Sequence, residues 1–210
     1  MQRYPMRFLI LSSCLFAFYG CSTVYENLQA TTGHTAGLQK FKPAFTTALY
    51  TANIDVVGNH LSGLLLIKKM PDSTTRMVFS NEIGFKFFDF EFSPDGRFTV
   101  YSIIKKMNKR SVLRTLRKDF ELVLMQGLND SSVMIRKDNE LLYYIFPQQK
   151  GFNCYITNSA GDQLVRLERS SGTKPVVQMI MQNYINGIPD TIGVTHLNFD
   201  FMIGLKRIER

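Results

Sequence analysis

The sequence of 210 residues has no tryptophan and only three cysteines. Three widely separated cysteines do not make the disulfide framework of a small secreted domain. A lone cysteine in an apolar run, such as Cys154 between Phe152 and Thr157, is most often a small buried residue. The three histidines are far apart and have no chelating neighbour at the short spacing that zinc sites use. The sequence therefore predicts neither a disulfide scaffold nor a metal site.

The sequence also lacks the motifs that carry common catalytic chemistry. It has no Gly-x-Ser-x-Gly elbow, no His-Glu-x-x-His and no phosphate-binding glycine loop. Asp89 and Glu91 alternate along one strand, and solvent-facing positions explain them better than an acid pair does. His196 lies among apolar neighbours, as a structural histidine does. We therefore expect a protein that is not an enzyme and needs no cofactor.

No apolar run is long enough to cross a bilayer, which takes about 20 residues. The longest, Phe8–Phe18, follows Arg3 and Arg7 and has the length of a signal-peptide core. The tetrad that ends in Gly20-Cys21 is similar to the lipobox of bacterial lipoproteins, although its first two residues are bulkier than usual. We expect residues 1–20 to be a cleaved signal peptide and Cys21 to be the lipid attachment site. The alternative is an ordinary signal peptide with a cysteine at its end by chance.

Acylation of Cys21 would hold the chain on a membrane, because each buried methylene contributes about 0.8 kcal/mol and more than one chain gives stable attachment. Ser22 rather than Asp follows, which in the enteric sorting rule directs a lipoprotein to the outer membrane. We expect a lipid-anchored envelope protein that meets no nucleic acid. The polar segment 21–43 is either a flexible tether or a first short helix. The net charge of +8 is scattered, which fits a solvated surface or one that tolerates anionic head groups.

From residue 44 the pattern is that of β-structure, and we expect one domain over 44–210. Tyr50, Ala52, Ile54 and Val56 alternate with polar residues, with the period of two of a half-buried strand. Short turn sequences between successive apolar segments predict an antiparallel meander. The eleven expected strands are 50–56, 61–70, 76–80, 85–92, 97–104, 133–137, 141–146, 152–157, 164–169, 176–182 and 195–205.

One amphipathic helix interrupts the strands. Apolar residues recur at spacings of three and four from Val112 to Leu124, and basic residues cover much of the remaining surface. Asn108 is the expected N-cap, and Gly127 marks the end of the helix after about Met125. So many strands in one sheet must split or curl. We expect a mainly β fold, a large curved antiparallel sheet that forms a half-open barrel with the helix covering its concave face.

This order of elements resembles a known superfamily. A polar N-terminal segment, a long meander, a mid-chain helix, further strands and a final strand at Pro189–Leu197 follow one another, and Asn81-Glu82-x-Gly84 precedes the Phe-rich segment 86–90. The pattern over about 44–205 resembles the LolA/LolB superfamily of periplasmic lipoprotein carriers, including LolB-like lipoproteins of Bacteroidota-type bacteria. The resemblance implies an unclosed barrel with a lipid-accepting cavity. It also implies acylated lipoprotein cargo and a periplasmic carrier as partners, and Cys21 favours the anchored, LolB-like side.

Two sets of candidate site residues follow. LolB-type proteins project an apolar residue from the turn between their third and fourth strands, and Ile83 lies in the matching turn. It could dip into a bilayer or fold back into the rim of the core. Phe88, Phe90 and Phe92 share one strand face, with Phe85 and Phe87 on the other. The candidate acyl-chain cavity consists of Leu65, Ile67, Met77, Phe79, Phe88, Phe90, Leu116 and Phe120.

The same residues also have a simpler interpretation. Aromatic and methionine side chains at strand spacing form an ordinary core in most proteins, although the ten methionines suit a surface that repacks around variable chains. With a cavity, the protein would accept acyl chains. With a filled core, it would be a structural or accessory lipoprotein of an envelope complex.

Overall fold

The computed structural model describes residues 24–25, 27–56, 58–128 and 132–208. The expected signal peptide and Cys21 lie outside these residues. Within them, 13 strands form one antiparallel sheet in the order β1-β7-β8-β9-β10-β11-β12-β13-β2-β3-β4-β5-β6, together with the α-helix α1 (Arg110–Val123) and the 3-10 helix η2 (Thr35–Phe41). The strands are β1 (Gln29–Ala30), β2 (Thr47–Val56), β3 (Asn59–Lys69), β4 (Thr75–Ser80), β5 (Lys86–Phe92), β6 (Phe98–Ile103), β7 (Met134–Lys137), β8 (Leu141–Pro147), β9 (Phe152–Asn158), β10 (Leu164–Ser170), β11 (Pro175–Ile185), β12 (Ile188–His196) and β13 (Phe201–Arg207).

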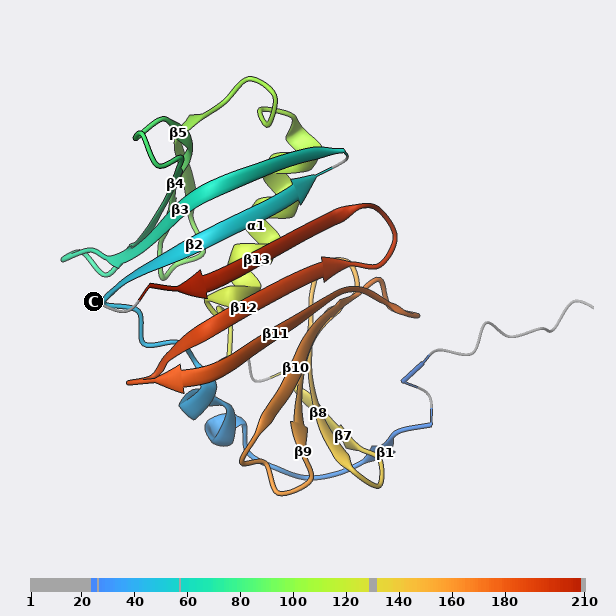
Figure 1. Cartoon of the computed structure of the whole chain (residues 1–210). Coiled ribbons are helices and arrows are strands. Elements are labelled where there is room, and N and C mark those ends of the chain that lie inside the picture. The colour runs from blue at the N-terminus through green and yellow to red at the C-terminus, as the bar shows by residue number, and fades with distance from the viewer. Residues whose placement is uncertain (1–23, 26, 57, 129–131, 209–210) are drawn as a thin grey trace, which may run out of the picture.

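The sheet curls without closing, and α1 crosses its concave side (Figure 1). Its two edges are β1 and β6. The last strand, β13, pairs with both β12 and β2 and so joins the two meanders, β2–β6 and β7–β12. The predicted fold class, a mainly β half-barrel with a helix on its concave face, is confirmed.

Two details of the strand prediction are wrong. The expected strand 195–205 is two strands, because β12 ends at His196 and β13 begins at Phe201. The alternating pattern continues through residues 197–200, where the chain in fact turns back. The segment Pro189–Leu197, expected as the final strand, instead lies up to His196 in the next-to-last strand β12, which begins after a tight turn at Asn186 and Gly187. Both turn residues have positive φ, 52° and 74°, as a two-residue hairpin of the Asn-Gly type requires.

The described residues before β2 pack against the sheet. Leu38 of η2 is fully buried, and β1 pairs with β7. Tyr25 is also buried, and its hydroxyl donates to Oε2 of Glu168 over 2.6 Å. Within the described residues of this segment, Thr35–Phe41 form the short helix η2. The pairing of a two-residue strand carries too little sequence pattern to have been predicted.

The helix differs from its prediction at both ends. Lys109, not Asn108, is the N-cap and makes no side-chain capping bond, so the prediction of Asn108 is wrong. The N–H of Asn108 instead bonds back to the carbonyl of Ile104, within a turn that precedes the helix. At the other end the left-handed residue is Met125, with φ 46°, and Gln126 N–H bonds to Glu121 O at 3.1 Å. This is a Schellman ending in which a methionine takes the place usual for glycine.

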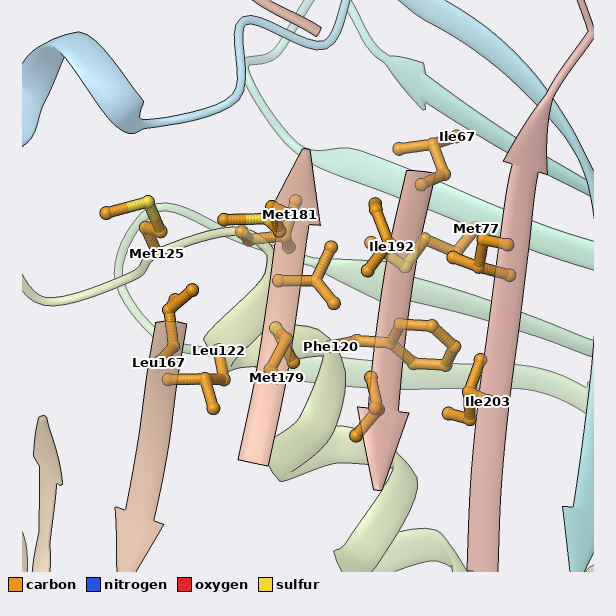
Figure 2. Packing of buried hydrophobic residues seen from close by; sticks show 14 of the residues in the cluster. Ile67, Met77, Phe120, Leu122, Met125, Leu167, Met179, Met181, Ile192 and Ile203 are labelled. Atoms are coloured by element: carbon orange, nitrogen blue, oxygen red, sulfur yellow. The ribbon is translucent and has the colours of Figure 1, made fainter. Parts of the chain in front are cut away.

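The main core lies between the concave face of the sheet and α1. Figure 2 shows Phe120 and Leu122 of α1 among side chains from β11, β12 and β13. A second, smaller cluster lies on the opposite face, where Tyr25 covers β8 and β9. The rings of Phe88 and Phe90 stack at a centroid distance of 4.3 Å, and Phe120 lies 5.7 Å from Phe88. The apolar stripe of α1 is thus buried against an aromatic patch of β5.

The prediction that Phe87 lies on the outer face of the sheet with Phe85 is wrong. The β4–β5 register shifts between Phe79 and Ser80, as at a β-bulge. An extra residue on one strand turns a side chain to the other face. The ring of Phe87 therefore packs 4.7 Å from that of Phe79 and joins the core, whereas Phe85 is 56% exposed.

Candidate functional site

The eight candidate cavity residues meet beneath α1, and they fill the space there. Leu116 and Phe120 come from α1, and the other six come from β3, β4 and β5. All eight are 0% exposed and belong to one core cluster. They are therefore packed against one another and their neighbours, as in an ordinary protein interior. An acyl chain can reach them only if α1 moves away from the sheet.

A buried group of charges also ties α1 to the sheet. Asp119 of α1 is 0% exposed, and its Oδ2 accepts a bond from Nε2 of His196 on β12 over 2.9 Å. Its Oδ1 lies 3.0 Å from Nη1 of Arg169 on β10, at ion-pair distance but without the angles of a hydrogen bond. A buried carboxylate must be paired to offset its desolvation. Sequence periodicity places Asp119 on the helix but gives no sign of these partners, which are far away in the chain.

A groove opens at the C-terminal end of α1, with a volume of about 670 Å³. Four largely buried apolar side chains line it: Phe45, Phe92, Leu124 and Leu128. Lys42 and Lys69 line it as well and are exposed. The sequence analysis missed this groove, because Phe45 and Leu128 lie just outside the predicted strand and helix. Apolar residues in the connections next to α1 are the signal that could have indicated it.

Ile83 lies at the tip of the β4–β5 turn and is 90% exposed, so it does not fold back into the rim of the core. The turn is held by its own hydrogen bonds. Gly84 N–H donates to Asn81 O over 3.0 Å, and Phe85 N–H donates to the side-chain oxygen of Asn81 over 2.8 Å. The turn therefore presents Ile83 to the surroundings on a well-ordered support.

The prediction that Asp89 faces solvent is wrong. Asp89 is 2% exposed and accepts two bonds from the guanidinium of Arg76, at 2.8 and 3.0 Å. Lys86 adds a third bond at 3.1 Å. These partners, Arg76 first, hold the pKa of Asp89 below its usual value. The bidentate pair links β4 to β5, so this acid has a structural partner rather than the raised pKa of a general acid.

Other reactive groups are few in the part of the chain that the structure describes. Cys154 is fully buried, and burial raises the pKa of its thiol, which makes it inert. Within the described ranges, no three His, Cys, Asp or Glu side chains gather as metal ligands would. Nor does any described helix have the length and apolar content needed to cross a membrane.

Comparison with known proteins reveals similarity in structure only. No protein-family model and no curated protein matches the sequence. A domain from Vibrio parahaemolyticus assigned to outer membrane lipoprotein sorting has a TM-score of 0.45 and 10% identity, over 83% of this chain and 90% of that one. A DUF1329 family protein from Desulfovibrio piger has a TM-score of 0.45 and 14% identity, over 85% of this chain and 92% of that one. The chain is thus similar to these two proteins in overall shape, at a level that says nothing about what it binds.

Proposed function

We propose that this protein is an envelope lipoprotein, anchored through Cys21 in the outer membrane, that accepts acyl chains of lipids or lipoproteins into its half-barrel. The role is binding rather than catalysis. One observation carries the proposal: the helix α1 covers the apolar concave face of an unclosed sheet. Because α1 takes no part in strand pairing, it can be displaced without unpairing any strand.

A chain of aromatic contacts suggests how an acyl chain would enter. Phe92 lines the groove at the end of α1, and its ring lies 6.3 Å from that of Phe120. Phe120 in turn contacts Phe88 in the interior. Displacement of the last turns of α1 would therefore extend the groove into the space beneath the helix.

A ligand that displaces α1 must offset the free energy that packing of α1 against the sheet contributes. Four apolar side chains of α1 are buried: Leu116, Phe120, Leu122 and Val123. Each contributes about 1.5–3 kcal/mol on burial. Opening therefore costs several kcal/mol of apolar burial, which acyl methylenes offset at about 0.8 kcal/mol each. It also separates the buried Asp119 from Arg169 and His196, a cost that methylenes do not offset. In this LolB-like role an acylated lipoprotein would be the cargo and a periplasmic carrier its donor, while Ile83 dips into the bilayer.

The decisive experiment uses residues 22–210, which keep every residue of both core clusters, from Tyr25 to Leu205. We expect lipid to co-purify, as seen by mass spectrometry, and a fluorescent fatty acid to bind and be displaced by a lipopeptide. A protein that carries no lipid and takes up neither probe would contradict the proposal.

Anchoring is tested separately in the full-length chain. Cys21→Ala should move the protein from the membrane fraction to the soluble fraction. Cys14→Ala, which changes a cysteine within the expected signal peptide, is the matched control and should stay with the membrane. Continued membrane association of the Cys21 variant would rule out the lipid anchor.

The filled interior supports a second candidate. The eight candidate cavity residues are 0% exposed, so the core is complete without a ligand. A structural or accessory lipoprotein of an envelope complex would keep this closed form, with α1 in place. In that case the fatty acid would fail to bind and cross-linking in cells would identify a protein partner instead.

A further inference from the structure

One end of the half-barrel gathers features that are far apart in the sequence. In an antiparallel sheet, alternate connections lie at the same end. The strand registers place the β4–β5, β8–β9, β10–β11 and β12–β13 turns at the same end of the strands, where the segment from β6 into α1 also lies. In Figure 1 they follow one another along the curved edge of the sheet. We call this end the Ile83 rim: residues 81–84, 104–109, 148–151, 171–174 and 197–200.

The N-terminal segment reaches the domain at this same rim. Val24 N–H donates to Thr173 O over 3.2 Å, in the β10–β11 turn. Cys21 is three residues before Val24, and three residues span at most about 11 Å. Tyr25 is buried and bonded to Glu168, so the tether to Cys21 could lengthen only if Tyr25 left the sheet and lost that hydrogen bond. Acyl chains on Cys21 would therefore hold the Ile83 rim next to the bilayer.

A basic groove lies where α1 passes the β8–β9 turn, with a volume of about 780 Å³. It is lined by Arg114, Arg117, Lys118, Glu121, Gln148, Gln149 and Lys150. Glu121 is paired with Arg117 over 2.6 Å. The other three basic side chains, on Arg114, Lys118 and Lys150, have no carboxylate partner in the described part of the chain. The groove thus has an excess of positive charge and several amide donors.

The groove wall is fixed close to the anchored segment. Gly151 has φ 73°, and a Cβ at this position would lie 1.8 Å from Ser170 O, so the β8–β9 turn presses directly against the end of β10. This places Lys150 beside the β10–β11 turn that holds Val24. On the helix side, the pKa of Lys118 is lowered by its burial and by the nearby cations Arg169, Arg114 and Arg117. Positive charges crowded in this way favour a bound anion.

We propose that this basic groove binds the phosphate groups of anionic lipids in the bilayer to which the chain is anchored. The inference rests on the anchoring at Cys21 proposed above. On the neighbouring β12–β13 loop, Leu197 and Phe199 are 49% and 43% exposed and enter the same bilayer. The exposed acids of this rim, Glu82 and Asp200, lie on other turns than Lys150. The acyl anchor and the groove then fix the domain with the Ile83 rim towards the membrane.

The test measures flotation of residues 22–210, free of any acyl anchor, with phosphatidylglycerol or phosphatidylcholine vesicles. We expect binding to phosphatidylglycerol only. Arg114→Gln combined with Lys150→Gln should weaken it on the order of 30-fold, because each basic residue near an anionic surface contributes a factor of about five. Lys68→Gln combined with Lys137→Gln is the matched control. It removes the same charge from exposed positions at the opposite end of the strands and should change binding only a few-fold.

Equal losses in the two double variants would show a general effect of net charge and would overturn the inference, as would equal binding to both vesicle types. Inorganic phosphate is added at constant ionic strength. It should compete with the lipid phosphate for the groove. Protein that binds inorganic phosphate but not phosphatidylglycerol vesicles would mean that the groove takes a soluble anion rather than a membrane. The fatty-acid assay separates this inference from the acyl-binding role, because the groove variant should bind the probe as the unmodified protein does. If the groove variant loses vesicle binding but still binds the fatty acid, the result bears on the groove and leaves the acyl-binding role unaffected.

Discussion

Replacing Phe120 by alanine tests most directly how α1 closes the interior. The side chain is 0% exposed and lies against the rings of Phe88 and Phe92. Loss of a buried phenylalanine costs about 3–5 kcal/mol, from lost transfer energy and the cavity left behind. For a domain of this size, each kcal/mol lowers Tm by about 2–4 °C, so we expect a decrease of about 6–20 °C. Urea and thermal unfolding, followed by circular dichroism, measure the change.

The same variant should bind an acyl chain more readily, because the void beneath α1 lies where we place the chain and the helix is held less firmly. A fatty acid at 100 times its Kd would restore about 2.7 kcal/mol of the lost stability. Ile156→Ala is the control: this side chain is equally buried, but in the small cluster on the opposite face. It should lose about 2–5 kcal/mol without gaining affinity for the fatty acid. If Phe120→Ala and Ile156→Ala respond to the fatty acid alike, the acyl site does not lie beneath α1.

Three further predictions concern the stability of the sheet. Asp89→Asn should lower the free energy of unfolding by about 1.5–3 kcal/mol at pH 7. The pKa of Asp89 in the folded protein lies below its usual value near 3.9. The ionised carboxylate therefore stabilises the folded state above about pH 4, and this stabilisation is lost as the pH falls through the folded pKa. The difference between the two proteins should therefore shrink below about pH 4, and a constant difference would contradict the ion pair. Tyr155→Phe should raise the free energy of unfolding by about 1–3 kcal/mol, since this buried hydroxyl has no partner among the described residues, and a decrease would show that it has one. Gly63→Ala should destabilise by about 1–3 kcal/mol, because its Cβ would lie 2.1 Å from Ser80 O. Gly204→Ala, with nothing within 4 Å, should cost less, and equal costs would mean that β3 does not approach this turn so closely.

Local patterns were sufficient to predict the elements that dominate the fold. The alternation along β2 matches its burial, with the side chains from Ala48 to Val56 buried at every second position. The apolar stripe of α1 likewise predicted which side faces the sheet, since Leu116 and Phe120 are both buried. Both patterns are visible because one face of each element meets the core and the other meets water.

Features that depend on distant partners could not be predicted in this way. Asp89 was predicted to face solvent because its partner Arg76 lies on the neighbouring strand and is not adjacent in the sequence. The β-bulge that turns Phe87 inward cannot be recognised from the amino-acid composition of β5. The grouping of Asp119 with Arg169 and His196 needs the full topology. Whether Phe88 and its neighbours form a cavity or a filled core depends on the position of α1, and the same apolar residues suit both.

The position of β13 has a consequence for how the chain folds. This strand comes later in the sequence than every other described strand, yet it lies between β12 and β2 and links the two meanders. Until it arrives, the edge of β2 has no neighbour on that side, and pairings between residues as far apart as Asn53 and Gly204 are slow to form. The exposed edge is a site for mispairing with other chains. Truncation just before β13 should therefore be far more harmful than the length of the removed segment suggests, because it leaves the two meanders unjoined.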